Sequence, residues 1–268
     1  MKMIWEVEKA HRRSVLIGTA HFFPYSFRRS LSGLIRDADT VLFEGPLDPE
    51  SLAAVLEVGR GGADGPHLFQ SLDPRTVKKI CGVLNPARQE RLSFLSLSYP
   101  GPREEAPAYG LIRGMKPWLA FFTIWSRYLE KKGWKHSVDM EGYQIAMEMG
   151  KRIIPLESIE EQIRVLENLP CERLLKFLER IDEWDGYARE YVRRYLDGDL
   201  EGIRSATGLF PSRTSSVIDR RDGILFSRML HHLEKGATVV FVGAPHIPGI
   251  CSLLEEQGYQ VKRHVREI

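Results

Sequence analysis

The chain has 268 residues, with 38 Lys and Arg against 36 Asp and Glu, and its formal net charge is +2. This near balance gives no reason to expect a nucleic-acid-binding surface or a general attraction to membranes. Hydrophobic residues make up 43% and charged residues 28%, which is ordinary for a soluble globular protein with a sizeable core. At about 150 residues per domain, the length allows one large domain or two small ones.

The cysteines and the N-terminus bear on the cellular compartment. Cys81, Cys171 and Cys251 lie far apart, which excludes a disulfide scaffold or a thiolate zinc site and fits a reducing environment. Charged residues already occur among the first nine positions, so the N-terminus has no apolar signal-peptide region. The longest apolar run, 118–125, is much shorter than the roughly 20 residues that a membrane span needs. We therefore expect a cytoplasmic protein without a membrane span.

The first quarter of the chain alternates apolar runs with helical patterns. Its apolar residues between 27 and 38 recur at spacings of three and four, which is the period of a helix face. In chain order we predict strands at 4–7 and 14–17 joined as a hairpin, a helix at 27–38, a strand at 40–43, a helix at 49–58 and a Gly-rich loop at 59–65.

Residues 60–135 are predicted to form a helical insertion within a single domain that spans 1–268. Pro and Gly interrupt its helices, and 99–107 has the Pro- and Glu-rich composition of a loop. A helix at 117–131 carries five aromatic residues at spacings of three and four. This spacing predicts core packing rather than a platform for stacking nucleic-acid bases.

The second half of the chain continues the alternation. In order we predict a helix at 139–150, a strand at 152–156, helices beginning near 159 and 174, a charge-rich solvated helix face at 182–199, a long helix at 218–233, a strand at 238–242, a helix at 250–257 and an edge strand at 259–264. Apolar strands alternating with helices indicate an α/β fold, with a central, mostly parallel or mixed sheet flanked by helices.

Four predicted strands end on residues that suit catalysis or metal binding. In α/β sheets, ligands bind beyond the carboxyl ends of the strands, so a site is expected at these positions. The strand at 14–17 leads into His21 and the strand at 238–242 into His246, while Glu44 and Glu157 follow the other two. Imidazoles and carboxylates are both metal ligands and general bases.

The two histidine turns share the pattern Gly-x-x-His. Gly18 precedes His21 and Gly243 precedes His246, and each glycine permits a sharp turn over the sheet edge. A third match, at 133–136, follows a charged helix end rather than a strand. An isolated interior histidine is usually a hydrogen-bonded core residue, but a matched pair at two strand ends favours a functional role.

Each glutamate has a structural alternative. Glu44 precedes a Gly-Pro break and is equally suited to capping the next helix. Glu157 precedes Ser158, and we favour a role as an acidic residue at the start of the following helix. Other active-site motifs are missing: 59–65 lacks the Lys-Ser/Thr of a phosphate loop, and no Gly-x-Ser-x-Gly occurs.

Taken together, these motifs resemble the TraB/PrgY/GumN family, which is related to the Tiki metalloproteases and more distantly to erythromycin-esterase-like proteins. In chain order the matching segments are Leu16-Ile17-Gly18-Thr19-Ala20-His21, Ala38-Asp39-Thr40-Val41-Leu42-Phe43-Glu44, Ser137-Val138-Asp139, Gly150-Lys151-Arg152-Ile153-Ile154-Pro155-Leu156-Glu157, Glu160-Glu161-Gln162, Arg221-Asp222 and Val242-Gly243-Ala244-Pro245-His246-Ile247-Pro248-Gly249. The number and order of the segments are specific for the family but not for a substrate.

The resemblance implies an active site at the paired Gly-x-x-His motifs and the first glutamate, which here are His21, His246 and Glu44. Proteolysis that depends on manganese or cobalt is attributed to the Tiki branch. The chain departs from the family pattern at Pro245, often Gly, and at Asp222, usually Asn. Pro245 removes a backbone donor, and Asp222 adds a charge that would alter substrate preference. The region 60–135 has no motif match and is expected to select the substrate.

Our leading hypothesis is therefore a metal-dependent, peptidase-like hydrolase acting on a peptide or on a small amide or ester. His21 and His246 would bind Mn²⁺, Co²⁺ or Zn²⁺, and Glu44 would complete the ligand set or act as a general base.

Three further residues have supporting roles in this hypothesis. Asp139 and Glu157 are expected to be additional ligands or to orient the ligands, and Arg221 to stabilise an oxyanion. Two alternatives stay open: a metal-independent esterase in which a histidine activates water, and a regulatory protein that binds a peptide signal without cleaving it, as in pheromone shutdown. The sequence carries no signal for the oligomeric state.

Overall fold

The computed structural model describes residues 1–61, 68–84, 110, 112–206 and 208–264. They form an α/β fold with one mixed six-stranded sheet, in the order β4-β3-β5-β2-β1-β6. The strands are β1 (Ile4–Lys9), β2 (Arg12–Thr19), β3 (Thr40–Phe43), β4 (Arg152–Pro155), β5 (Thr238–Gly243) and β6 (Gln260–Arg263).

Parallel pairing brings distant segments to one edge of the sheet. β3 pairs in parallel with both β4 and β5, and β5 pairs in parallel with β2, so these four strands end at the same edge. β1 is antiparallel to β2 and to β6, which confirms the predicted N-terminal hairpin and the edge strand. The carboxyl ends of β2, β3, β4 and β5 are those that lead to the four candidate residues.

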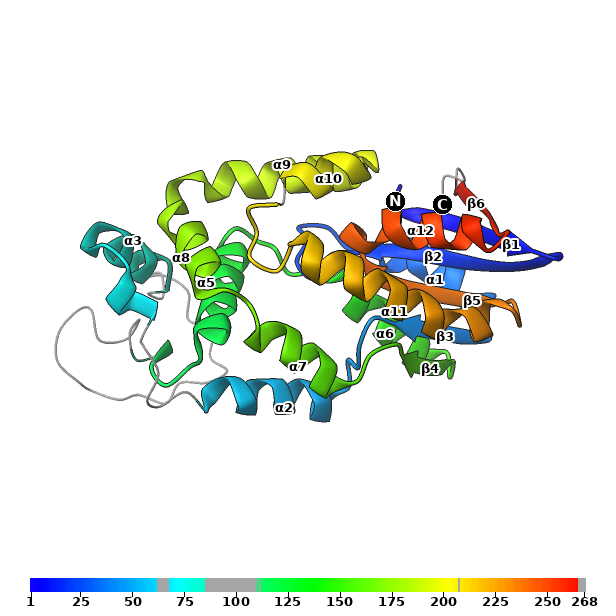
Figure 1. Ribbon diagram of the computed structural model, residues 1–268, viewed down its shortest axis with the longest axis horizontal. Helices are drawn as coiled ribbons and strands as arrows, with labels where there is room; N and C mark the ends of the chain where they lie inside the picture. The colour runs from blue at the N-terminus through cyan, green and yellow to red at the C-terminus, as the bar shows by residue number, and fades with distance from the viewer. Residues whose placement is uncertain (62–67, 85–109, 111, 207, 265–268) are drawn as a thin grey trace.

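Helices cover both faces of the sheet, as Figure 1 shows. α1 (Arg28–Arg36) and α6 (Val138–Glu148) pack together behind the strands, whereas α11 (Ser215–Leu233) and α12 (Ile247–Glu256) lie in front of them. Gly142 of α6 packs directly on the ring of Phe241 in β5, where an added Cβ would lie 2.6 Å from the ring.

A second, helical layer stands beyond the carboxyl edge of the sheet (Figure 1). It is built from α2 (Pro49–Arg60), α3 (Pro74–Leu84), α5 (Pro117–Lys131), α7 (Ile159–Glu167), α8 (Cys171–Glu179), α9 (Trp184–Asp197) and α10 (Leu200–Ala206), with short 3₁₀ turns at Leu68–Ser71 and Ile181–Glu183. A further 3₁₀ turn, Ala244–His246, joins β5 to α12 at the sheet edge. The predicted insertion at 60–135 accounts for only part of this layer, because α7, α8, α9 and α10 come from 159–206. Positions 62–65 of the predicted Gly-rich loop and the predicted loop at 99–107 lie outside the described residues.

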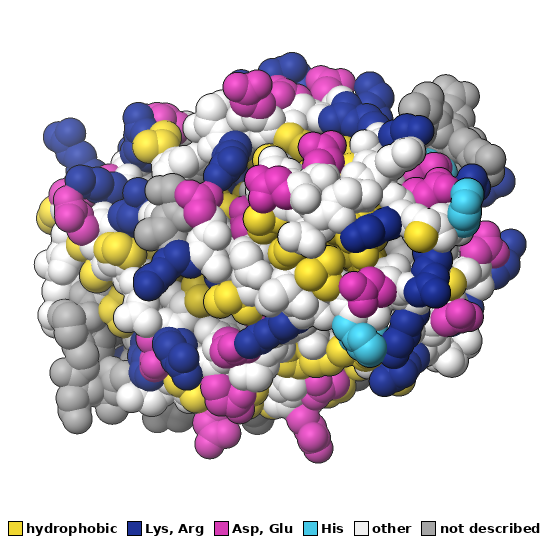
Figure 2. Space-filling view, turned by 45° about the vertical axis from the view of Figure 1, so that its right-hand side comes forward, with side chains coloured by type: hydrophobic (Ala, Val, Ile, Leu, Met, Phe, Trp, Pro, Cys, Tyr) yellow, Lys and Arg dark blue, Asp and Glu magenta, His cyan; other side chains and the backbone are white. Residues whose placement is uncertain are grey.

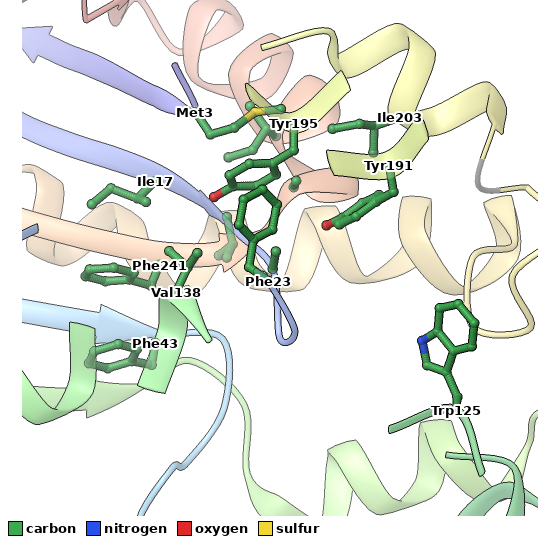
Figure 3. Close-up of a cluster of buried hydrophobic side chains, with 14 of the residues drawn as sticks. Met3, Ile17, Phe23, Phe43, Trp125, Val138, Tyr191, Tyr195, Ile203 and Phe241 are labelled. Atoms are coloured by element: carbon green, nitrogen blue, oxygen red, sulfur yellow. The ribbon is translucent and has the colours of Figure 1, made fainter. Parts of the chain in front are cut away.

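The helical layer has an aromatic core that continues into the core of the sheet. In α5 the side chains of Trp118, Phe121, Trp125 and Tyr128 are buried, which confirms the predicted core packing. The charge-rich segment 182–199 is not only a solvated face, because α9 buries Trp184, Ala188, Tyr191 and Tyr195 along one stripe. Figure 3 shows Tyr195 and Phe23 against the strand ends, with Tyr191 and Trp125 further from the sheet.

On the surface, charges of both signs are mixed. Basic and acidic side chains are interspersed over the face that Figure 2 shows. Among the described helices, none combines the length and the apolar character that crossing a bilayer requires. Among the described residues, Cys81, Cys171 and Cys251 form no disulfide.

Candidate functional site

His21 lies just beyond β2 and is held by a carboxylate from α6. Its Nδ1 donates to Oδ2 of Asp139 at 2.5 Å, and the hydroxyl of Ser137 donates to Oδ1 of Asp139 at 2.5 Å. Ser137 also caps α6 by accepting from the backbone N–H of Met140, which fixes the first turn of that helix. The Asp139 side chain is 8% exposed and that of His21 is 73% exposed.

The charge of Asp139 raises the pKa of His21 to about 9. Burial raises the pKa of Asp139, but the His21 charge and hydrogen bond outweigh this effect and hold that pKa below its usual value. His21 is therefore an imidazolium at neutral pH in this structure, and its Nε2–H is the part available to a ligand.

His246 follows β5 and makes the matching contact on the other side of the site. Its Nδ1 donates to Oδ1 of Asp222 at 2.6 Å, and both side chains are 6% exposed. Asp222 lies on α11 and packs against Gly249, where an added Cβ would lie 1.9 Å from Oδ2. Because Nδ1 carries the donated hydrogen, Nε2 of a neutral His246 is an acceptor, and the donor that faces it is Nη1 of Arg221 at 3.5 Å.

Glu44 follows β3 and is held by two donors. The backbone N–H of Gly243 donates to its Oε2 at 2.7 Å, and Nη2 of Arg221 donates to its Oε1 at 2.5 Å. Burial raises the pKa of Glu44, but the opposite charges of Arg221 and His246 and the Gly243 hydrogen bond hold it well below its usual value. Glu44 does not cap α2, since Asp48 does so by accepting from Ser51.

Arg221 joins the ends of β3 and β4. Its Nε and Nη2 donate to Glu157 at 2.8 and 2.5 Å, while Nη2 also contacts Glu44. Its pKa is raised, because both carboxylates outweigh the cost of burial. Glu157 is 4% exposed and serves this ion pair rather than the next helix, whose cap is the reciprocal Ser158–Glu161 box. Glu157, favoured as an acidic residue at the start of the following helix, stands directly before its Ser158 cap, and its side chain binds Arg221.

The sheet edge thus brings the predicted residues into two neighbouring groups. In one, Glu44 Oε1 lies 3.9 Å from Nε2 of His246, and Nη1 of Arg221 lies 3.5 Å from the same nitrogen. The other is the His21–Asp139 pair, and the charge of Glu44 acts on His21 as well. Gly18 belongs to neither group. Its carbonyl accepts a hydrogen bond from the buried Tyr195 hydroxyl at 2.6 Å.

Both groups face a cavity of about 1000 Å³ between the sheet edge and the helical layer. His21, Glu44 and His246 line it from the sheet side. Its opposite walls are mainly apolar and include Leu52, Val55, Trp118, Leu119, Phe122, Trp125, Leu129, Trp134, Val165, Leu166, Tyr187 and Phe210. A large apolar cavity with a few convergent polar groups is the usual form of a ligand-binding site.

A family model described as the TraB/PrgY/gumN family matches residues 3–263. The chain belongs to this family. The match covers nearly the whole chain, including both Gly-x-x-His turns and all strands of the sheet. No curated protein and no solved structure matches the chain.

The donor set of this TraB/PrgY/gumN chain can be compared with the needs of a divalent metal ion. Two imidazoles, each oriented by a carboxylate on Nδ1, and the carboxylate of Glu44 are ligands of a suitable type, and the Asp–His pairs resemble the outer partners of metal-bound histidines. No group of three or more His, Cys, Asp or Glu is already arranged as a metal site among the described residues. The residue types present suit a metal ion. A bound ion would share the carboxylate of Glu44 with the guanidinium of Arg221.

Three residues at the site have a position that the sequence motifs do not predict. Asp222 was noted only as a departure from the family pattern, yet it holds His246. His136, from the discounted third Gly-x-x-His, lines the cavity, and its Nδ1 donates to Glu141 at 3.0 Å. Arg213 lines it too, with no motif around it. The signal available for His136 was the Gly-x-x-His pattern itself, without a preceding strand.

Proposed function

We propose that this chain is a hydrolase that cleaves an amide or ester bond, with His21, Glu44 and His246 at its centre and a peptide as substrate. The observation that carries the proposal is a pair of histidines in one cavity, on either side of an ionised glutamate, each held by a carboxylate. The distance from Nδ1 to the carboxylate oxygen is 2.5 Å for His21 and 2.6 Å for His246. An acid–histidine pair orients the ring and increases the basicity of its free nitrogen, for proton transfer or for ligation.

In the form without a metal ion, the side chains of His246 and His21 carry out the proton transfers. Nε2 of His246 accepts a proton from the attacking water, and the hydroxide forms a bond to the carbonyl carbon. Nε2–H of His21 gives a proton to the leaving nitrogen or oxygen as its bond to carbon breaks, and exchange with solvent then restores both rings. Nη1 of Arg221, whose one hydrogen bond among the described residues is the 3.5 Å contact to His246, is placed to stabilise the oxyanion.

In the leading form of the proposal a divalent ion, Mn²⁺, Co²⁺ or Zn²⁺, is held by His21 and His246, with Glu44 as a further ligand or as general base. When bound, such an ion lowers the pKa of a ligated water and polarises the carbonyl group. Asp139 and Asp222 keep the two rings oriented in this form as well.

A second candidate is metal-independent hydrolysis by the same residues. It is favoured by Arg221, a fixed cation that already binds Oε1 of Glu44 and lies 3.5 Å from Nε2 of His246. In this form Glu44 stays paired, and the two histidines carry out the acid–base steps alone. A regulatory protein that binds a peptide without cleaving it is the remaining alternative.

The test is turnover of a panel of short peptides and esters, with Mn²⁺, Co²⁺ or Zn²⁺ added or with EDTA. Glu44→Gln keeps the shape of the side chain and should lower turnover by about 100-fold or more, in the range of general acid–base groups. Glu161→Gln is the matched control, because it removes the charge of another glutamate that pairs with an arginine of α11 but lies outside the cavity. Glu161→Gln should keep wild-type turnover.

Metal analysis of the dialysed protein separates the two forms. The leading form predicts a bound ion that is lost in both His21→Ala and His246→Ala, and loss of turnover with EDTA. Turnover that persists in EDTA supports the second candidate. If no member of the panel is cleaved under any condition, the hydrolase proposal fails. If Glu44→Gln cleaves as well as wild type, the leading form, in which Glu44 is a ligand or the general base, fails.

A further inference from the structure

Arg213 lies on the cavity wall and is not part of the ion pairs that Arg221 forms with Glu44 and Glu157. It belongs to the segment between α10 and α11, and its guanidinium carbon lies 5.0 Å from the centre of the Tyr191 ring and 5.5 Å from that of Phe210. Both rings also line the cavity. Arg213 and His21 line the same cavity, and the charge of Arg213 acts on His21.

The guanidinium of Arg213 has unused hydrogen-bonding capacity. Its Nη1 is buried and has no hydrogen-bond partner among the described residues. Arg221, in contrast, is bound by Glu44 and Glu157. A buried cationic N–H without an acceptor is costly, so it needs an explanation, and a ligand that supplies the acceptor is one.

The surroundings of Arg213 restrict the ligand that would supply this acceptor. The side chains of Trp125, Tyr187 and Phe210 make the neighbouring wall apolar, and the stacked Tyr187 and Phe210 rings lie 6.2 Å apart. A guanidinium fork matches a planar carboxylate with two hydrogen bonds. The ligand class that fits is therefore a monocarboxylate with an apolar body.

We propose that the cavity recognises the free C-terminal carboxylate of a short peptide through Arg213, with the apolar C-terminal side chain against the aromatic wall. The choice of a peptide rests on the proposed hydrolase function, whereas the carboxylate and the apolar body follow from the cavity itself. Fatty acids share this chemistry and are the alternative source. Arg213 would thus hold the C-terminal end of the substrate while the bond to be cleaved faces His21 and His246.

The test is binding measured by calorimetry, with N-acetyl-leucyl-phenylalanine, its C-terminal amide and decanoate as probes. Acid and amide differ only in the group that Arg213 would bind. Wild type should bind the acid about tenfold or more tightly than the amide, and this ratio should fall to about one in Arg213→Gln. Arg213→Lys should keep part of the preference, because it retains the charge but not the fork.

Lys135→Gln is the matched control, since Lys135 is a second cation on the cavity wall. It should keep the wild-type preference, and unchanged amide binding in Arg213→Gln shows that the variant is folded. Equal binding of acid and amide by wild type, a preference that survives Arg213→Gln or disappears in Lys135→Gln, or no binding of either peptide overturns the proposal. Binding of decanoate alone, dependent on Arg213, overturns the peptide assignment.

This experiment also distinguishes failure of the binding proposal from failure of the function proposal. Peptide integrity is checked by mass spectrometry after each titration. An Arg213-dependent acid preference without turnover of any substrate would refute the hydrolase while leaving the carboxylate site in place. Turnover that depends on Glu44 but is indifferent to a free C-terminus would do the reverse.

Discussion

Replacement of Arg221 tests the buried ion pairs that join Glu44 and Glu157. Arg221→Met keeps much of the apolar volume but leaves Glu44 and Glu157, whose side chains are 19% and 4% exposed, without their shared cation. Removing one partner of a buried ion pair typically costs about 3–5 kcal/mol, because a buried charge is left uncompensated. The Gly243 hydrogen bond to Glu44 remains, so we expect the lower part of this range.

The matched control is Arg228→Met, on the same helix α11. Arg228 also pairs with a glutamate, Glu161, but their side chains are 40% and 33% exposed, and exposed pairs contribute about 0–1 kcal/mol. The free energy of unfolding would be measured by urea denaturation at several pH values. Equal, small losses for the two variants at neutral pH would refute the reasoning.

The pH dependence provides a second check on the same variant. Glu44 has a depressed pKa in the folded protein, so its contribution to stability is present above its unfolded value of about 4.5 and is lost as the pH falls. The deficit of Arg221→Met relative to wild type should therefore be largest at neutral pH and should shrink below about pH 4.5. A deficit that is independent of pH would mean that lost packing, rather than unpaired charge, destabilises the variant.

Two further predictions concern neighbouring parts of the structure. In the metal-free protein Asp139→Asn should lower the pKa of His21 from about 9 toward 6.5, because it removes the charge that raises it; an NMR titration measures this, and an unchanged pKa would contradict the pairing. Gly142→Ala should destabilise the protein by about 1–3 kcal/mol, since its Cβ would meet the Phe241 ring at 2.6 Å, whereas Gly223→Ala, with no atom within 4 Å, should be neutral or stabilising in thermal unfolding; equal effects would contradict the packing.

The elements that the sequence predicts well have short-range patterns. The predicted strand 40–43 and helix 117–131 have the same bounds in the structure as β3 and α5, because β-branched runs and three-to-four spacing are local signals. The convergence of His21, Glu44 and His246 on one cavity could also be anticipated, since parallel strands place their carboxyl ends at one edge.

The pairings within the site could not be predicted from the sequence. His21 and Asp139 are 118 positions apart, and Arg221 and Glu44 are 177 apart, so no local pattern links them. The many charged residues at 182–199 predicted a solvated helix face. The same helix also has a buried face, which includes Tyr191 and which the charge pattern does not indicate. Arg213 is part of no motif, and only its position beside the cavity and its unpaired nitrogen single it out.

The central claim is that water attacks a substrate at the His21–Glu44–His246 centre, and oxygen-isotope labelling tests it most directly. Wild type would be incubated in H₂¹⁸O with a mixture of short peptides that end in apolar residues, in the presence of Mn²⁺ or of EDTA. Mass spectrometry should detect new carboxyl ends that carry one ¹⁸O atom, at a level about 100-fold lower with Glu44→Gln. An unchanged, unlabelled mixture with wild type, or equal labelling by Glu44→Gln, would contradict the account.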